Sequence, residues 1–267
     1  MSIEIQSDID LTGLFPLNHA RIGYKNNVPD ATVTPSTEEA GFEADSVQNQ
    51  LTYELWRPTA MPADIVIDMG SAKAFNYIGL AAHTLGTESV TVTASYSSDD
   101  ISYTAIDPTA APSDDSSIML LFDEVTFRYV KLAFTGATVF SLGVVYVGQT
   151  LDMYRPFYSG HTPDSMGRMT TVKPTKSVAG QWLGRSIIRN GFNNGYEWKN
   201  IPVDWYRTNV DPFAVAAQRF PFFIAWNALE EPEDCLYAWT SKDISPALQG
   251  TRDLVSFGFD VEGLGGE

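Results

Sequence analysis

The chain has 267 residues, of which 17 are basic and 33 are acidic, so its formal net charge at pH 7 is −16. This length holds one large or two medium domains, each able to bury a core of its own, and we expect two. The acidic balance argues against a nucleic-acid backbone or an anionic membrane surface as a partner, because like charges repel and no basic block offsets them.

The start of the chain, "MSIEIQSDIDLTG", has no basic region followed by an apolar core, so it lacks the pattern of a secretory signal. No apolar run approaches the length that spans a membrane, and we expect no membrane insertion. Cys235 is the only cysteine in the sequence. An internal disulfide is therefore excluded, which favours folding in a reducing cytoplasm.

The first fifty residues carry little regular patterning. Residues 1–13 alternate weakly at three isoleucines, which is typical of either a flexible arm or an edge strand. Residues 15–24 mix apolar and turn residues and are expected to lead the chain onto a β-sandwich. Residues 25–50 are rich in Pro, Thr, Glu and Asn, as expected of long loops between strands.

The stretch from Trp56 to Gly148 contains short segments with the period-two alternation of half-buried strands. They are residues 65–70, 90–96 and 127–132, and residues 142–147 add a closing strand. Turn residues such as Ser98-Asp99-Asp100 separate them. Several strands without intervening helical periodicity favour an antiparallel sandwich.

These segments also carry a resemblance to a known family. Trp56, followed by "IVIDMG", "YIGLAAHTLG", "VTVTASYSSDD", "RYVKLAF" and "LGVVYVG", resembles the discoidin or coagulation-factor C-type domains, which are galactose-binding-like jelly rolls. The upstream stretch "ATVTPSTEEAGFEADSVQNQLTYELW" is similar to the family's first strand and the loop before its tryptophan, so the resemblance spans Leu14 to Gln149. Animal members usually close with a disulfide, and its absence here suggests a bacterial or viral setting.

The resemblance implies a candidate metal site in the acidic loop region. Galactose-binding-like domains often hold a structural calcium ion with carboxylates and backbone carbonyls. Asp30, Glu38 and Asp45 are the candidate ligands, although nothing here has the spacing of an EF-hand. A solvated acidic loop is the alternative.

The resemblance also implies candidate contacts to a carbohydrate. Trp56 is either a sugar-stacking platform or a core residue, and the resemblance favours the core. Tyr53 and Arg57 beside it are the more plausible exposed contacts. His83 lies in "AAHTLGT", which is similar to a His-Asn-Leu-Gly stretch in discoidin-like domains of phage tail proteins. Here Thr84 replaces the asparagine, and a structural role for His83 is the alternative.

The second part of the chain starts near Leu151. Residues 169–173 and 184–189 are expected to be strands, and basic residues concentrate between Arg155 and Arg207. Asp211-Pro212-Phe213 is a helix start with Asp211 as N-cap, and Phe213, Ala216, Ala217 and Phe220 follow at helical spacing. Three more strands are expected at residues 222–226, 235–240 and 254–261.

Element order and the letters "FFIAWN…LYAWT" in this part resemble small barrel-like domains of phage tail-tube and tail-tip proteins. The part is rich in tryptophan, which is enriched at interface hot spots. We therefore predict that Trp182, Trp198, Trp205 and Phe257 are buried between domains or subunits. A core role alone is the alternative.

Catalysis needs a nucleophile with a base, a carboxylate pair or a metal cluster. His19, His83 and His161 are scattered, without a zinc-binding pattern, and there is no GxSxG, P-loop or GxGxxG motif. Two glycosidase carboxylates on separate strands are the alternative. We expect no enzyme activity, no cofactor other than calcium, and a buried, unreactive Cys235.

The predicted fold class is mainly β. An N-terminal arm (residues 1–13) precedes a jelly-roll β-sandwich (14–150) and a smaller β-rich, barrel-like domain (151–267) with one short helix. The resemblances imply a structural protein of a bacteriophage tail tip or baseplate, distal-tail-like and assembled in the host cytoplasm. Its partners would be other tail proteins, further copies in a ring and a cell-surface glycan. The alternatives are a lectin-like module and an accessory domain of a polysaccharide-degrading enzyme.

Overall fold

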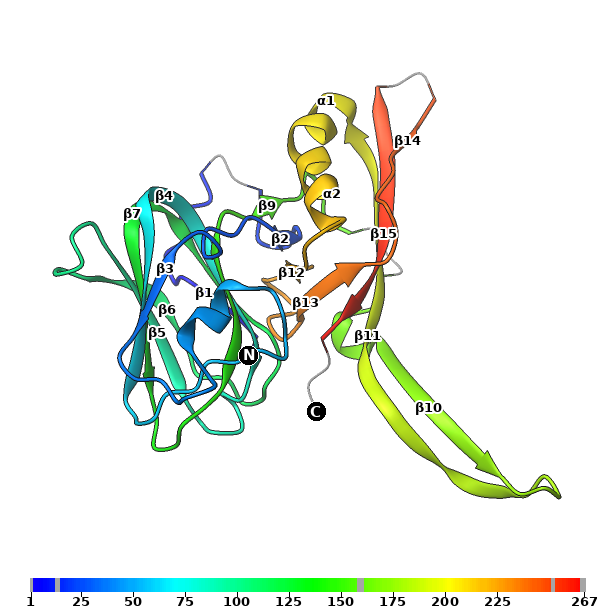
Figure 1. The fold of residues 1–267 in the computed structure, drawn as a ribbon. Coiled ribbons are helices and arrows are strands. Elements are labelled where there is room, and N and C mark those ends of the chain that lie inside the picture. Colours follow the sequence, from blue (N-terminus) through cyan, green and yellow to red (C-terminus); the bar gives the residue numbers. More distant parts are fainter. Residues whose placement is uncertain (1, 13–14, 158–160, 251–252, 265–267) are drawn as a thin grey trace.

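The structure is a computed structural model that describes residues 2–12, 15–157, 161–250 and 253–264. It is mainly β, as the sequence predicts, with two sheets that pack against one another and one group of short helices (Figure 1). None of the helices in the described part of the chain is long and apolar enough to cross a membrane.

The first sheet curls into the predicted sandwich. Its strands are β1 (Ile3–Ile5), β3 (Thr32–Pro35), β4 (Ala63–His83), β5 (Thr91–Ser97), β6 (Thr104–Ala110), β7 (Ile118–Thr135) and β8 (Leu142–Gly148). The order is β3-β4-β7-β5-β6, with β8 beside β4 and β1 parallel to β7. The N-terminal segment is thus an edge strand, one of its two predicted alternatives. A short 3-10 helix, η1 (Ala44–Gln48), lies in the loop before β4.

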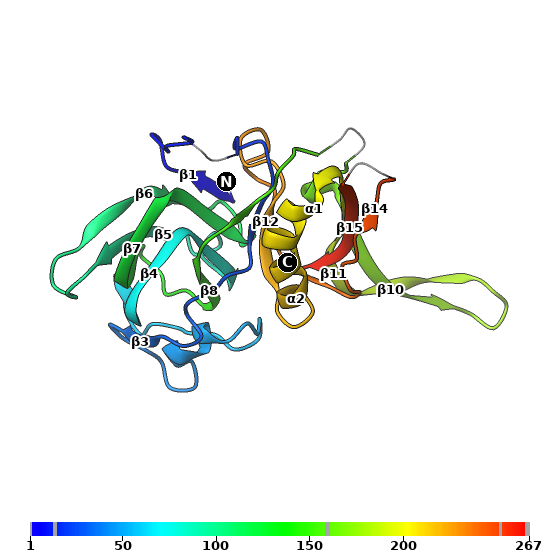
Figure 2. The same ribbon diagram turned by 90° about the horizontal axis from the view of Figure 1, so that it is seen from above.

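Two long strands turn this sheet into a sandwich. The β4–β7 pairing shifts register between Asp68 and Lys73 and again between Phe75 and Tyr77, so the first part of β4 pairs with β3 and the last part with β8. Such irregularities bend a strand. Figure 2 shows how the strands of this sheet curve around. The apolar faces of the two halves enclose one core, which contains Trp56.

The second sheet has the order β10-β11-β15-β13-β12-β2-β9. Its strands are β2 (Arg21–Gly23), β9 (Leu151–Asp152), β10 (Arg168–Lys176), β11 (Trp182–Pro202), β12 (Phe222–Ala225), β13 (Cys235–Thr240), β14 (Ala247–Leu248, paired with β15) and β15 (Leu254–Gly263). The strands expected at residues 169–173, 184–189, 222–226, 235–240 and 254–261 all lie in it. A 3-10 turn, η2 (Asp164–Met166), precedes β10.

Residues 21–23 lie in the second sheet and not in the sandwich, where the sequence placed them. Strand β2 pairs with β12 through Ile22 and Ile224, and β9 pairs with β2 on its other side. The reason is packing across the junction. A Cβ atom at Gly23 would lie 2.5 Å from the ring of Tyr77, so only glycine lets β2 pass this close to β4.

The helical segment begins earlier than predicted. α1 (Val203–Trp205), the π-helical η3 (Tyr206–Val210) and α2 (Asp211–Ala217) follow one another without a break. Val210, at the position before α2, already has helical angles, so Asp211 is not an N-cap. Phe213 and Ala217 are buried as expected, but Phe220 lies beyond the helix and is exposed. These helices cover one face of the second sheet (Figure 1).

A third apolar cluster holds the two sheets together. Tyr77 and Tyr146 from the outer face of the sandwich pack on Phe223 and Tyr237 from β12 and β13. Tyr146 also donates a hydrogen bond to the carbonyl of Pro221 at 2.8 Å. All four rings are fully buried, so the two parts are joined by a buried apolar interface and not only by the chain that connects them.

Candidate functional site

The three predicted carbohydrate contacts lie in different environments. Tyr53 is 73% exposed. The Arg57 guanidinium lies 4.3 Å from the ring centroid of Phe42 and donates to Ser141 Oγ at 3.2 Å. His83 is only 5% exposed, and burial lowers its pKa to about 4. A buried, neutral ring cannot stack on a surface sugar, so the structural alternative holds for His83. A sugar contact at Tyr53 and Arg57 stays a prediction.

Trp56 is a core residue. Its side chain is fully buried, meets Phe134 and Phe140 edge to face, and donates from Nε1 to the carbonyl of Thr37 at 3.1 Å. The core interpretation is confirmed, and a sugar-stacking role for Trp56 is wrong.

The three predicted calcium ligands do not gather. Asp30, Glu38 and Asp45 are all exposed, and Glu38 accepts a hydrogen bond from the backbone N–H of Ala44 at 3.0 Å. Within the described ranges, no three His, Cys, Asp or Glu side chains are placed to hold a metal ion. These side chains alone therefore do not form a metal site, and a calcium ion held with backbone carbonyls stays a prediction.

The four predicted interface residues lie in three different environments. Trp198 and Phe257 stack on each other with ring centroids 5.2 Å apart inside the second core, so for them the core alternative holds. Trp205 is half-buried, with its ring edge-on to Phe15 at 6.1 Å. Trp182 is 60% exposed, at the first residue of β11.

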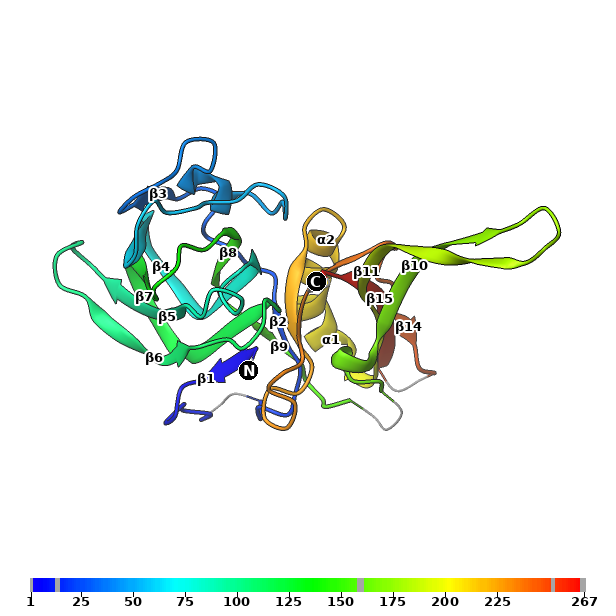
Figure 3. The ribbon, with the colours of Figure 1, turned by 90° about the horizontal axis from the view of Figure 1, so that it is seen from below.

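Trp182 belongs to a ribbon that stands off the body of the molecule. We call residues 168–190 the arm. In it, β10 pairs with the first half of β11. The pairing starts with Arg168 opposite Phe192 and ends with Lys176 opposite Trp182. Figures 1 and 3 show this ribbon projecting away from both sheets. At roughly 3.3 Å per residue, the nine residues of β10 reach about 30 Å.

The arm exposes apolar side chains. Fourteen large hydrophobic residues are exposed in the described part of the chain, and five of them lie in the arm. These five are Val178, Trp182, Leu183, Ile187 and Ile188. Scattered exposed hydrophobics are ordinary, but a gathered set marks an interaction surface.

The arm is also basic within an acidic protein. It carries five Lys or Arg residues and no Asp or Glu, so the rest of the chain has a formal charge of −16 − 5 = −21. Arg189, near the body, pairs with Glu262 at 3.2 Å. For Lys173, Lys176 and Arg185, further out, there is no ion pair to another described residue. The arm can therefore bind an acidic, partly apolar surface.

A buried polar cluster fixes the root of the arm. Asp234 accepts hydrogen bonds from the backbone N–H groups of Asp164 and Ser165, both at 3.0 Å, which holds η2 in place. Asp164 accepts from Tyr196 Oη at 2.6 Å and from Asn194 Nδ2. Burial raises the pKa of Asp164 to about 7. β10 starts two residues after η2, so this cluster sets where the arm leaves the body.

A second feature is a pocket of about 280 Å³ between the two sheets, which we call the junction pocket. Its apolar wall is formed by Phe15, Tyr24 and Trp205, and Glu124 and Asn209 offer hydrogen-bonding groups at its rim. Aromatic faces beside polar groups suit a small hydroxylated molecule. The volume lies just below the ~300–1,000 Å³ range of small-molecule pockets.

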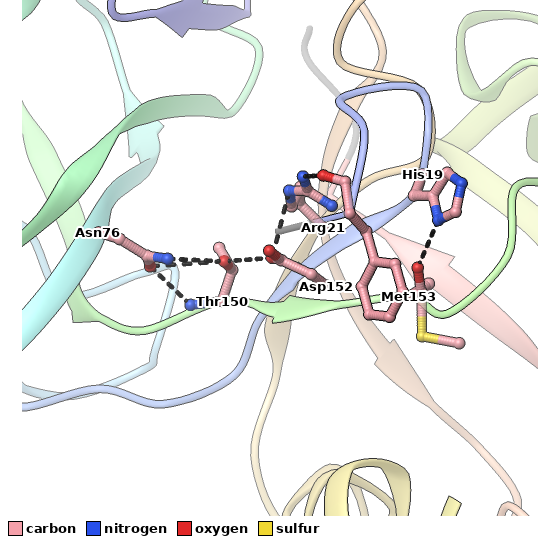
Figure 4. Close-up of polar contacts among 7 residues, drawn as sticks. His19, Arg21, Asn76, Thr150, Asp152 and Met153 are labelled. Atoms are coloured by element: carbon pink, nitrogen blue, oxygen red, sulfur yellow. Dashed lines mark hydrogen bonds and ion pairs between the residues drawn. The ribbon is translucent and has the colours of Figure 1, made fainter. Parts of the chain in front are cut away.

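A chain of hydrogen bonds connects Asn76, Thr150 and Asp152, which line the junction pocket, to the buried Arg21 (Figure 4). Asn76 donates to Thr150 Oγ1 at 3.1 Å, and Thr150 Oγ1 donates to Asp152 Oδ1 at 2.7 Å. Asp152 pairs with Arg21 Nε at 3.2 Å, and Arg21 also donates to the carbonyl of Phe15. Arg21 is only 4% exposed. These contacts thus join a sandwich strand to β9 and β2.

The sequence predicts the strands of the arm but not the projection of the arm from the body. The available signal was charge, since a run of 32 residues from Ser165 to Tyr196 has no acidic residue in so acidic a chain. The junction pocket had no local signal, because its walls come from separate segments spread along the chain from Phe15 to Asn209.

No protein-family model matches the chain, and no curated protein matches its sequence. Similar solved structures include a CBM32 module from Clostridium perfringens in complex with GalNAc-β-1,3-galactose, with 16% identity and a TM-score of 0.42 over 46% of this chain and 99% of that one. The CBM32 of AlyQ, in complex with 4,5-unsaturated mannuronic acid, has 24% identity and a TM-score of 0.38 over 43% and 92%. Chitosan-binding module 1 from a Paenibacillus chitosanase/glucanase has 23% identity and a TM-score of 0.40 over 46% and 98%. At these identities and TM-scores the likeness assigns neither ligand nor function to this chain.

Proposed function

We propose that the protein is a structural subunit that assembles with further copies of itself through the arm, and that the assembly is a bacteriophage tail tip or baseplate. The observation that carries the proposal is the arm itself. A two-stranded ribbon on its own is marginally stable in water. Burial against a neighbouring subunit would both order it and remove its exposed apolar residues from water.

Charge favours a second copy as the neighbour. The arm carries five positive charges and no negative one, and the rest of the chain carries a formal −21. Two copies can therefore attract each other arm to body, although their net charges repel. An arm that binds a different patch on the next subunit gives a head-to-tail contact, which closes into a ring or grows into a filament.

The tail setting rests on the sequence. The order of elements around "FFIAWN…LYAWT" resembles tail-tube and tail-tip domains, and residues 14–149 resemble discoidin-like domains that occur in tail proteins. The arm adds a means of assembly to that resemblance.

Light scattering on the purified full chain tests the proposal. We expect a defined oligomer that becomes monomeric when an Asn-Gly turn replaces residues 172–188, because Thr171 and Arg189 already pair and this turn closes a two-residue hairpin with little strain. Leu183→Ser with Ile188→Ser is a milder variant and should weaken assembly in the same direction. Negative-stain images of the wild-type oligomer should show rings or short stacks.

Ile101→Ser is the matched control, because Ile101 is 83% exposed on a sandwich loop away from the arm. It should leave the oligomer unchanged. A wild-type monomer at every concentration, or a shortened-arm variant with the wild-type mass, would contradict the proposal.

Carbohydrate binding is the second candidate function, and the junction pocket is the observation that favours it. Calorimetry with neutral mono- and disaccharides should show weak binding that Trp205→Ala abolishes. If Tyr53→Ala abolishes sugar binding and Trp205→Ala does not, the site is instead the loop that the sequence predicted. Absence of binding to any sugar tested would remove this function.

A further inference from the structure

A small anionic pocket lies at the root of the arm. Its volume is about 180 Å³, and we call it the root pocket. Thirteen residues line it, and none of them is Lys, Arg or His. Its four carboxyl groups come from Asp114, Asp164, Glu233 and Asp234. Apolar side chains, including Phe192 and Leu236, complete the wall.

One acidic side chain of the root pocket lacks a hydrogen-bond partner. Asp164 is 1% exposed, and its Oδ1 is shared by Asn194 and Tyr196. Its Oδ2 is buried without any partner in the described structure. Leaving a buried polar atom unpaired costs about 1–3 kcal/mol, so a donor that entered the pocket would relieve a real penalty.

The pocket suits one long cationic side chain better than a metal ion or a free small molecule. Among the described side chains there is no group of three ligands that could hold a metal ion. The volume of about 180 Å³ lies below the ~300 Å³ at which small-molecule pockets begin. Carboxylates beside apolar walls match a lysine or arginine, which buries its stem and pairs its charged end.

The protein's own distal arm cannot supply that side chain. From Arg168 at the root to Lys176 the strand runs eight residues, roughly 26 Å at ~3.3 Å per residue, and the arm points away from the body (Figure 1). A second copy of the chain can present Lys173, Lys176 and Arg185, for which no ion pair is formed with another described residue.

We propose that the root pocket receives the basic outer half of the arm from a second copy of the chain. This inference rests on the proposed assembly function and adds the receiving surface to it. Each subunit then uses its arm toward one neighbour and its root pocket toward the other. The two surfaces differ, so the contact is head-to-tail.

A charge swap in the full-length protein tests the pairing. Glu233 is exposed and accepts no hydrogen bond from another described residue, so Glu233→Lys removes and reverses a pocket charge without disturbing the core. We expect it to raise the concentration of half-assembly about ten-fold in light scattering at low salt. Lys176→Glu with Arg185→Glu should do the same. Combining all three changes should restore assembly, because the attraction is rebuilt with opposite signs.

Asp30→Lys is the control, since it reverses an equally exposed carboxylate on the sandwich and should not change assembly. Thermal melting of each variant checks that it is folded. If the shortened arm prevents assembly but Glu233→Lys does not, the root pocket is not the receptor, while the proposed function stands. Failure of the combined variant to recover would also overturn the pairing.

Discussion

The carboxyl group of Asp234 accepts a hydrogen bond from the backbone N–H of Asp164 at 3.0 Å, so two buried acidic residues lie side by side where the arm begins. Asp234 has two further donors, Ser165 N at 3.0 Å and Trp226 Nε1 at 2.8 Å. Asp164 keeps one oxygen unpaired. Burial, together with the charge of Asp234, raises the pKa of Asp164 to about 7.

The stability of the protein should depend on pH through Asp164. The pKa of Asp164 is about 7 in the folded state and 3.8 in the unfolded chain. Between these two pH values the native state therefore binds more protons than the unfolded state. The contribution of Asp164 to the free energy of unfolding is fully present below pH ~4 and is lost as pH rises through ~7. This loss is about 4 kcal/mol at most. Urea unfolding of wild type and Asp164→Asn from pH 4 to 8 measures it. Parallel profiles for the two proteins would contradict the prediction.

His83 should give a pH dependence of the opposite sign. Burial lowers its folded pKa from 6.5 to about 4, so the unfolded state binds the extra proton in this range. Its contribution is present above pH ~6.5 and is lost as pH falls toward ~4, by about 3 kcal/mol. His83→Gln keeps an acceptor for the backbone N–H of Leu85 and should be less sensitive to acid than wild type. An unchanged acid slope in unfolding experiments would count against a neutral buried His83.

The ion pair below the junction pocket should be costly to break on one side. Arg21→Met leaves Asp152 half-buried without its cation, and we expect a loss of about 3 kcal/mol in unfolding free energy. Arg21→Met with Asp152→Leu removes both charges and should lose less than the single change. A double-mutant cycle by urea unfolding gives the coupling. Additive losses would show that the two residues do not act as a pair.

Gly23 should tolerate no side chain. Gly23→Ala would place a methyl group 2.5 Å from the ring of Tyr77, which is fully buried and whose hydroxyl donates to the Lys25 carbonyl at 2.7 Å. Since the ring cannot move freely, we expect a loss of about 1–3 kcal/mol. Gly195→Ala is the control, because its methyl group would meet only a carboxylate oxygen of Asp260 at 3.1 Å. Equal melting temperatures for the two variants would refute this packing argument.

Strand content was readable from the sequence because it is local. The alternation in residues 65–70, 90–96 and 254–261 appears as buried and exposed faces of β4, β5 and β15. A strand's two faces are set by the side-chain period alone. Trp56 was placed in the core from resemblance, and its full burial agrees.

The acidic character of the chain, its single cysteine and its mainly β elements were fixed by residue identity, which needs no partner to be read. The tertiary structure decided which sheet takes residues 21–23, that His83 is buried, and that the ribbon around Trp182 stands clear of the body. Each of these depends on contacts between segments far apart in sequence. Local periodicity sets which side chains share a face of a strand, but only long-range packing decides what that face meets.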